Sequence, residues 1–135
     1  MSSTIRITYL DHSGFAVQMP DALLIFDDAR GPAPQGTSLD QGWITREQVA
    51  QSPRTYVFVS HSHADHFDAS IFDWAEPSRV QYILSTDVPA QWKGRRMAPG
   101  DVLQLDDYTI TAHASTDLGV SYLVRHPACT LFHAG

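Results

Sequence analysis

The stretch that decides the fold is Tyr56-Val57-Phe58-Val59-Ser60-His61-Ser62-His63-Ala64-Asp65-His66-Phe67. Its first four residues favour β-structure and predict a buried strand over 56–59. Three histidines and an aspartate follow within six positions. Because alternate side chains of an extended segment point the same way, His61 and His63 are expected to reach one point in space. Asp65 and His66 come where the chain must turn, and they are expected to reach a second point nearby.

Imidazole nitrogens and carboxylate oxygens are the ligands that zinc, iron and manganese accept in proteins. A lone histidine at a strand end is usually solvent-exposed, and a lone aspartate usually caps a helix. Here three of the seven histidines stand in one short window directly behind an apolar strand. The spacing fits a ligand geometry, so it predicts a metal site rather than a coincidence of composition.

The run His61-Ser62-His63-Ala64-Asp65-His66 resembles the H-x-H-x-D-H signature of the metallo-β-lactamase-fold hydrolases. The resemblance implies that His61 and His63 bind one metal ion and that Asp65, also the catalytic candidate, binds a second ion with His66. It implies two zinc ions, with iron or manganese as alternatives, and a metal-bound hydroxide that attacks the substrate. Two cations about 3.5–4 Å apart lower the pKa of a shared water and stabilise the developing oxyanion.

The rest of the chain predicts short strands and short helices. Apolar and alternating segments predict strands over 5–10, 15–19, 23–26, 80–85, 102–105, 108–113, 119–124 and 130–133. Helices are expected from Thr45 to about Gln51, over 67–76, and in one or two turns before Trp92. Segment 29–42 is expected to be a loop, either a flap over the site or a mobile surface loop. The fold class is α/β (α+β), a mixed sheet with short helices on one side, which the resemblance identifies as the N-terminal half of an αβ/βα sandwich.

Four further residues are candidates near the site. Asp27 ends an apolar strand; it either starts a solvated turn or orients a ligand histidine or the loop backbone, and the resemblance favours the second role. A histidine in a turn is normally solvent-exposed, but His12 lies in a His-Ser-Gly turn, a feature that family members carry near the mouth of the site. The family's third histidine should lie near 112–117, so His113 and Asp117 are candidates for that region.

The resemblance implies that residues 1–135 are a metallo-β-lactamase-fold domain that is incomplete at its C-terminus. In the family, a run like Thr130-Leu131-Phe132-His133-Ala134-Gly135 leads into an aspartate that bridges both metals, and the sequence stops before that position. Without the other half of the sandwich, one face of the sheet is expected to expose Leu24, Phe26, Val57 and Val59. Such a face predicts self-association or pairing with a complementary chain.

Composition limits the partners. The net charge is −6, from 9 basic and 15 acidic residues, so nucleic acid is not expected as a partner. Gly94-Arg95-Arg96 is the only local basic cluster; it is expected to be a solvated turn, or else to meet an anionic small-molecule substrate. No membrane-spanning run and no signal peptide are visible, and Cys129 is the only cysteine. These features favour a cytoplasmic location.

Two main functions are consistent with these patterns; a third, a diiron redox relative of the same fold, would be revealed by a visible absorption spectrum. The first is a metal-dependent hydrolase of an ester, lactone or phosphoester. The strand meander with its His-Ser-Gly turn resembles that of family members related to sugar-phosphate lactonases and other cytoplasmic hydrolases. The second is a truncated metal-binding fragment or assembly module with little or no catalysis. The number of bound ions and the presence of turnover would separate them.

Overall fold

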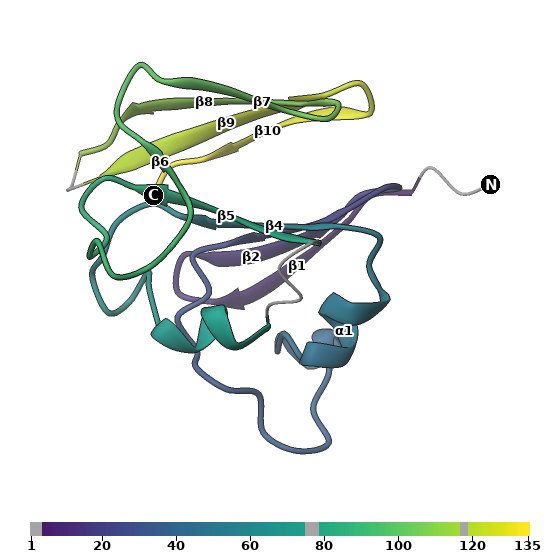
Figure 1. Ribbon diagram of the computed structural model, residues 1–135. Coiled ribbons are helices and arrows are strands. Elements are labelled where there is room, and N and C mark those ends of the chain that lie inside the picture. Colours follow the sequence, from purple (N-terminus) through teal and green to yellow (C-terminus); the bar gives the residue numbers. More distant parts are fainter. Residues whose placement is uncertain (1–3, 75–78, 117–118) are drawn as a thin grey trace.

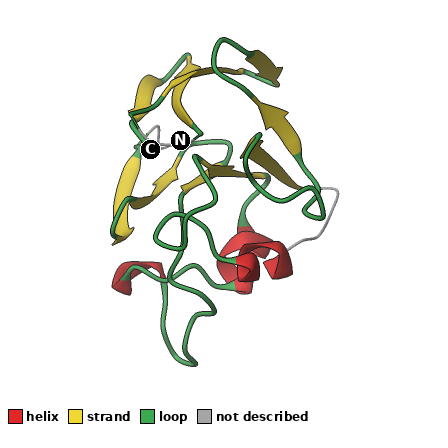
Figure 2. Ribbon diagram, turned by 90° about the vertical axis from the view of Figure 1, so that its left-hand side faces the viewer, coloured by secondary structure: helices red, strands yellow, loops and turns green. Residues whose placement is uncertain are grey.

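The computed structural model describes residues 4–74, 79–116 and 119–135. These residues form two β-sheets, one above the other, with helices gathered below the lower sheet (Figure 1). Figure 2 shows the helices on one side of the strands. The predicted class, a mixed sheet with short helices on one side, is therefore confirmed, and a second sheet covers the other side.

The lower sheet is mixed and has the strand order β1-β2-β3-β4-β5-β6 among the described residues. Its first three strands pair antiparallel, and β3 to β6 pair in parallel. Every residue of β3 and β4 is buried, because both faces of these central strands are covered. The strands are β1 (Arg6–Asp11), β2 (Gly14–Gln18), β3 (Leu23–Phe26), β4 (Thr55–Val59), β5 (Val80–Ser85) and β6 (Arg95–Met97).

The upper sheet is antiparallel, with the order β10-β9-β8-β7. Along β8 the residues Tyr108, Ile110 and Ala112 are buried and alternate with more exposed ones, so one face of this sheet points into the molecule. The strands are β7 (Val102–Leu105), β8 (Tyr108–Ala114), β9 (Val120–His126) and β10 (Cys129–His133).

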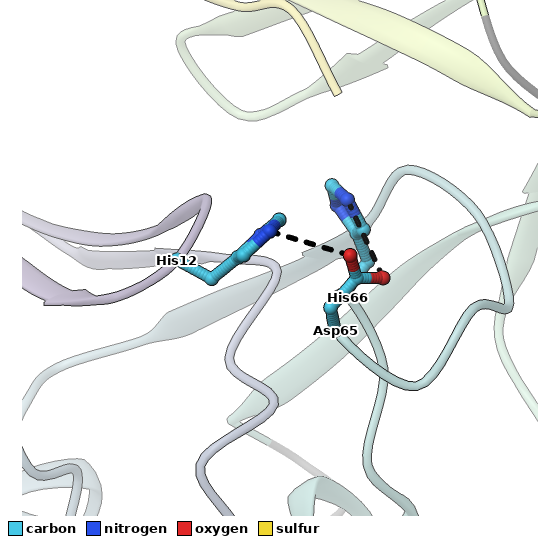
Figure 3. Close-up of side chains that lie close together, drawn as sticks. All are labelled: His12, Asp65 and His66. Carbon is cyan, nitrogen blue, oxygen red and sulfur yellow. Dashed lines mark ion pairs between the residues drawn. The ribbon is translucent and has the colours of Figure 1, made fainter.

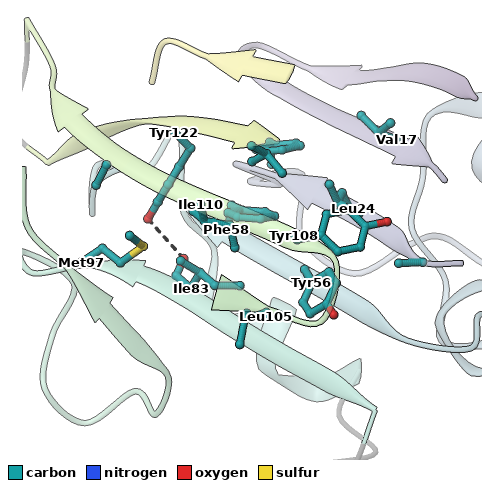
Figure 4. Packing of buried hydrophobic residues seen from close by; sticks show 14 of the residues in the cluster. Val17, Leu24, Tyr56, Phe58, Ile83, Met97, Leu105, Tyr108, Ile110 and Tyr122 are labelled. Atoms are coloured by element: carbon teal, nitrogen blue, oxygen red, sulfur yellow. Dashed lines mark hydrogen bonds between the residues drawn. The ribbon is translucent and has the colours of Figure 1, made fainter. Parts of the chain in front are cut away.

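A hydrophobic core fills the space between the two sheets, as Figure 4 shows. Leu24 and Phe26 belong to it, and Val57 and Val59 lie in a second core on the opposite face, toward the helices. None of the four is more than 3% exposed. The expectation of an exposed apolar face is therefore wrong, since the later strands of this same chain fold over it. Self-association was expected only because of that exposed face, so its burial removes the reason for expecting it.

The described helices are short. In α1 (Arg46–Gln51), the Thr45 Oγ1 atom accepts a hydrogen bond from the Gln48 N–H at 3.1 Å, which is the predicted N-cap. The helix expected over 67–76 is a 3₁₀ helix, η2 (Ala69–Trp74), within the described residues, and loop 29–42 contains η1 (Leu39–Gln41). None of the described helices has the length and apolar character to cross a membrane.

Two local predictions between β5 and β7 are wrong. The segment before Trp92 forms successive turns rather than a helix. Arg95 and Arg96 belong to strand β6 instead of forming a turn. The guanidinium of Arg96 donates to the carbonyls of Val88, Pro89 and Trp92, so this arginine holds the turns together. Pairing of β6 with β5 explains why a basic segment became a strand.

Candidate metal centre

Asp27 is the buried anchor of the centre. It follows β3, has a positive φ of 49° and is 1% exposed. Its Oδ1 accepts a hydrogen bond from the Ser60 N–H at 2.7 Å, and its Oδ2 accepts one from the Ser60 hydroxyl at 2.5 Å. The Nδ1 atom of His66 lies 2.7 Å from the same Oδ2. Asp27 thus contacts both the loop backbone and a candidate ligand.

This network sets the tautomer that a neutral imidazole has at His61 and at His66. Because a carboxylate can only accept, Nδ1 of His66 must carry the proton, which leaves the lone pair on Nε2. The Ser60 hydroxyl donates to Asp27, so it accepts from Nδ1 of His61, which lies 3.1 Å away. His61 then also has its lone pair on Nε2. Neutral imidazoles held in this way by a buried carboxylate are typical of metal ligands.

The loop that carries the candidate ligands, residues 60–66 (the ligand loop), is a turn and does not continue strand β4. β4 ends at Val59, and the N–H groups of His66 and Phe67 both donate to the His63 carbonyl. We expected His61 and His63 to point the same way because they alternate along an extended segment, and that reason is wrong. Their imidazole rings nevertheless lie close together, with ring centroids 4.7 Å apart. The next helix, η2, begins at Ala69 rather than at residue 67, so Asp65 and His66 lie in the loop before it.

Two groups of donor atoms meet at Asp65 within the described residues. One is His61, His63 and Asp65, and the other is His12, Asp65 and His66; in each group, one donor atom per residue lies within 4.8 Å of the others. Figure 3 shows the second group, with His12 reaching across from the β1–β2 turn. The expected four ligands of the loop are thus close together, and His12 joins them.

The donor set fits a divalent cation. His12 Nε2 lies 3.3 Å from Asp65 Oδ2, and His66 Nε2 lies 3.7 Å from Asp65 Oδ1. Two donors bound to one tetrahedral zinc ion would be about 3.4 Å apart, given metal–ligand bonds of about 2.0–2.2 Å. Imidazole nitrogens with a carboxylate suit zinc, iron or manganese.

The loop is held in place by residues that the sequence did not single out. Asp87, after β5, accepts hydrogen bonds from the Ser62 N–H at 2.9 Å and from the Ser85 hydroxyl. Partial burial acts to raise the pKa of Asp87, but these hydrogen bonds outweigh it and the pKa is lowered. Gly119, after β8, lies so close that a Cβ there would be 1.9 Å from the Ser60 carbonyl oxygen. No sequence signal could have joined residues so far apart in the chain.

His133 at the end of β10 is a third residue that the sequence did not single out. Its Nε2–H donates to the Ser13 carbonyl at 2.6 Å, so the lone pair is on Nδ1. This Nδ1 is buried, has no hydrogen-bond partner within the described part of the chain, and lies 4.0 Å from Asp27 Oδ2. A histidine at the last position of the last predicted strand was the available signal.

The remaining candidates lie elsewhere. His113 is exposed on β8, on the face opposite to the buried Ile110 and Ala112, and it belongs to neither donor group. Asp117 lies outside the described residues. Arg95 is exposed on β6, and Arg96 binds the turn carbonyls described above.

A third cluster, formed by Asp21, Asp107 and His126, has a different character. The Ala128 N–H donates to Nδ1 of His126 at 3.0 Å, so the proton of this imidazole is on Nε2, 3.4 Å from Asp21 Oδ2. An N–H directed at a carboxylate is a hydrogen-bonded pair, and it leaves no lone pair for a metal.

A hollow of about 490 Å³ adjoins the donor atoms. Arg30 is one of the residues that line it, and the Arg30 guanidinium stacks on Trp43 at 3.6 Å and donates to the carbonyls of Leu10 and Gly42. Loop 29–42 is thereby fixed at its base beside the centre. A larger hollow of about 700 Å³ lies under the outer part of that loop and contains none of the candidate ligands. The smaller hollow is lined by Tyr9, Asp11, His12, Ala29, Arg30, Ala64 and Asp65.

The chain is similar to proteins described as metal-dependent hydrolases. No family model matches the chain. It is 27% identical over 143 aligned residues to a UPF0173 metal-dependent hydrolase of Brucella canis, and the match covers 96% of this chain and 57% of that protein. A protein from Brucella suis with the same description matches equally well. The chain thus spans little more than half the length of these curated relatives.

Solved structures show the same fold. Igni18, a metallo hydrolase from the archaeon Ignicoccus hospitalis, superposes with a TM-score of 0.68 at 19% identity, covering 97% of this chain and 60% of that one. BJP-1, a subclass B3 metallo-β-lactamase of Bradyrhizobium japonicum, superposes with a TM-score of 0.54 at 16% identity, covering 98% and 59%. The chain has the metallo-β-lactamase fold, as its H-x-H-x-D-H run predicted.

Proposed function

We propose that the chain provides the metal-binding part of a metal-dependent hydrolase that acts on a small-molecule ester, lactone or phosphoester. The observation that supports this most is the network around Asp27. One buried carboxylate, directly and through Ser60, gives both His61 and His66 the tautomer that a metal ligand needs. The curated relatives named metal-dependent hydrolases agree with it.

In this proposal His61 and His63 hold one ion, and Asp65 and His66 hold the second, with zinc as the first choice and iron or manganese as alternatives. Bound divalent cations would supply an activated water and stabilise negative charge on the substrate. The chain's own part is to keep the donors fixed. Asp27 and Ser60 orient the imidazoles, and Asp87 holds the loop backbone at Ser62.

The hollow beside Asp65 is the proposed place for the substrate. Its volume of about 490 Å³ suits a small molecule. Arg30 lines this hollow together with His12 and Asp65, so it replaces Arg95 and Arg96 as the residue that would meet an anionic substrate. The cytoplasmic location expected from the composition is part of the same proposal.

The alternative is a metal-binding fragment or assembly module with little turnover. The partial coverage of the relatives favours it, because the matched region is 57% of their length. Metal content after loading with Zn²⁺ or Mn²⁺, and hydrolysis of a generic phosphodiester and a generic lactone, separate the two. Two ions per chain with turnover support the hydrolase, and one ion or fewer without turnover supports the fragment.

Two variants complete this test. His61→Ala and Asp65→Ala should remove bound metal and any turnover without unfolding the strand core, because both residues follow the end of β4. His113→Ala is the matched control, since His113 is exposed and belongs to neither donor group. Unchanged metal content in both of the first two variants would contradict the proposal.

A further inference from the structure

We propose that His12 is a protein ligand of the ion held by Asp65 and His66, an assignment that rests on the proposed metal-dependent function. The sequence motif supplies only two donors to this ion. A catalytic zinc site usually has three protein ligands and an open position. His12 comes from a different segment, the turn between β1 and β2, and completes such a set.

The geometry supports this role. His12 Nε2 lies 3.3 Å from Asp65 Oδ2, close to the spacing of about 3.4 Å expected for two donors on one tetrahedral ion. The rings of His12 and His66 are 5.2 Å apart and nearly perpendicular, with an interplanar angle of 79°. In Figure 3 the two imidazoles approach Asp65 from different sides. The three donors therefore surround one small volume rather than stacking against one another.

His12 also has a partner that can set its tautomer. The Ser13 hydroxyl lies 3.1 Å from Nδ1 of His12, the same distance as from the Ser60 hydroxyl to Nδ1 of His61. When Nδ1–H donates to this hydroxyl, Nε2 carries the lone pair and faces Asp65. The two sides of the centre thus use the same serine–histidine arrangement.

The turn that carries His12 is fixed on several sides. His12 itself has a positive φ of 49°, and its N–H donates to Asp11 Oδ1 at 3.0 Å. His133 donates to the Ser13 carbonyl, which ties the turn to β10. A Cβ on Gly14 would lie 2.9 Å from the carbonyl oxygen of Asp27, so the turn packs directly against the anchor of the centre.

A simple surface ion pair is the competing explanation. The side chains of His12 and Asp65 are 53% and 52% exposed, and an exposed pair contributes only about 0–1 kcal/mol to stability. Such a pair needs neither a second imidazole nor a fixed turn. An ion pair also requires the proton on Nε2 of His12, whereas a ligand requires the lone pair there. Metal binding therefore distinguishes the two.

The test is titration of the metal-free full chain with Zn²⁺ alone, followed by calorimetry and by metal analysis after gel filtration. His12→Asn is the main variant, because asparagine tolerates positive φ and is a poor zinc ligand. We expect wild type to bind two ions. The variant should keep the ion of His61 and His63 and bind the other at least about 100-fold more weakly, since even outer partners of ligands change affinity by about 10–100-fold.

His113→Asn serves as the matched control and should bind both ions like wild type. His12→Gly is a second variant, because glycine adopts positive φ without strain, and circular dichroism verifies that both variants are folded. Free imidazole should restore the second ion in His12→Gly. Two tightly bound ions in either folded variant would overturn the role of His12 and leave the proposed function intact. A wild type that binds no ion would overturn both.

Discussion

At the scale of single residues, two adjacent aspartates at the end of β3 have opposite roles. Asp27 and Asp28 are both buried, at 1% and 6% exposure. Asp27 is surrounded by donors from Ser60 and His66, which compensate for its burial. Asp28 accepts only the Arg30 N–H at 3.2 Å among the hydrogen bonds of the described residues. Burial therefore raises the pKa of Asp28 to about 6.

Asp27→Asn should weaken both the fold and the centre. The amide nitrogen cannot accept the hydrogen bonds that Ser60 and His66 direct at this position, so we expect a loss of about 2–3 kcal/mol in the free energy of unfolding. Zinc affinity should fall by about 10–100-fold, as for other partners of ligating histidines. Urea unfolding followed by tryptophan fluorescence and zinc calorimetry measure the two effects. Wild-type zinc affinity in this variant would contradict the orienting role.

Asp28→Asn, one residue away, is the matched control and should have the opposite effect on stability. The folded-state pKa of about 6 is above the ordinary 3.8, so the folded protein holds this proton more tightly than the unfolded chain. Stability is therefore lost as pH rises from about 4 to about 6. The neutral amide keeps an acceptor for Arg30 and should stabilise the fold by up to about 3 kcal/mol at pH 8. Below about pH 4 the two proteins should be alike, and a gain that does not depend on pH would contradict this account.

At the scale of elements, the ligand loop after β4 depends on the connections around it. The β3 end, the segment after β5 and the segment before β9 all contact it, through Asp27, Asp87 and Gly119. The Val120 N–H also donates to the Ser60 carbonyl at 2.8 Å. The donor geometry is thus set by three loops that lie at the same end of the sheet.

Gly119→Ala tests this dependence. Gly119 has a φ of +83°, and an added Cβ would lie 1.9 Å from the Ser60 carbonyl oxygen and 2.7 Å from the His61 Cβ. Gly100 is the matched control, because it has a φ of +95° and nothing within 4 Å of an added Cβ. Both variants carry backbone strain, so the contact alone should make Gly119→Ala less stable by about a further 1–3 kcal/mol and lower its zinc affinity. Equal thermal unfolding and equal zinc binding would contradict the role of this contact.

At the scale of the whole molecule, stability depends on the packing of one sheet against the other. Tyr122 of β9 links them, because its hydroxyl donates to the Val59 carbonyl of β4 at 2.8 Å. Burial raises the pKa of Tyr122 well above its ordinary value. Its ring also contacts Phe58 edge-on, with ring centroids 5.2 Å apart. The upper sheet is therefore joined to the strand that leads into the centre.

Tyr122→Phe should keep the packing and remove the hydrogen bond. The Val59 carbonyl then loses a buried donor, and we expect a loss of about 1–2 kcal/mol in the free energy of unfolding. Tyr9→Phe is the control, since Tyr9 is 56% exposed, and it should change stability by less than about 0.5 kcal/mol. Equal urea midpoints for the two variants would show that the link is unimportant.

The sequence alone determined most of the strands and the types of donor atom in the candidate centre. Apolar runs and alternation located the strands, because each strand's burial is encoded in its own residues. The H-x-H-x-D-H run identified the fold and brought four donors into one short loop. Local predictions were wrong where a neighbouring strand determines the structure of a segment. In β6, pairing with β5 makes a strand of a basic segment.

Only the tertiary structure decided which faces are covered and which distant side chains join the centre. The apolar face of the lower sheet is buried by strands that lie many residues later, so its exposure could not be judged from β3 and β4 alone. His12 and Gly119 reach the ligand loop through the arrangement of the two sheets, and His133 reaches the Ser13 carbonyl in the turn that carries His12. The physical reason is that periodicity records the burial of each residue but not the identity of the partner that buries it.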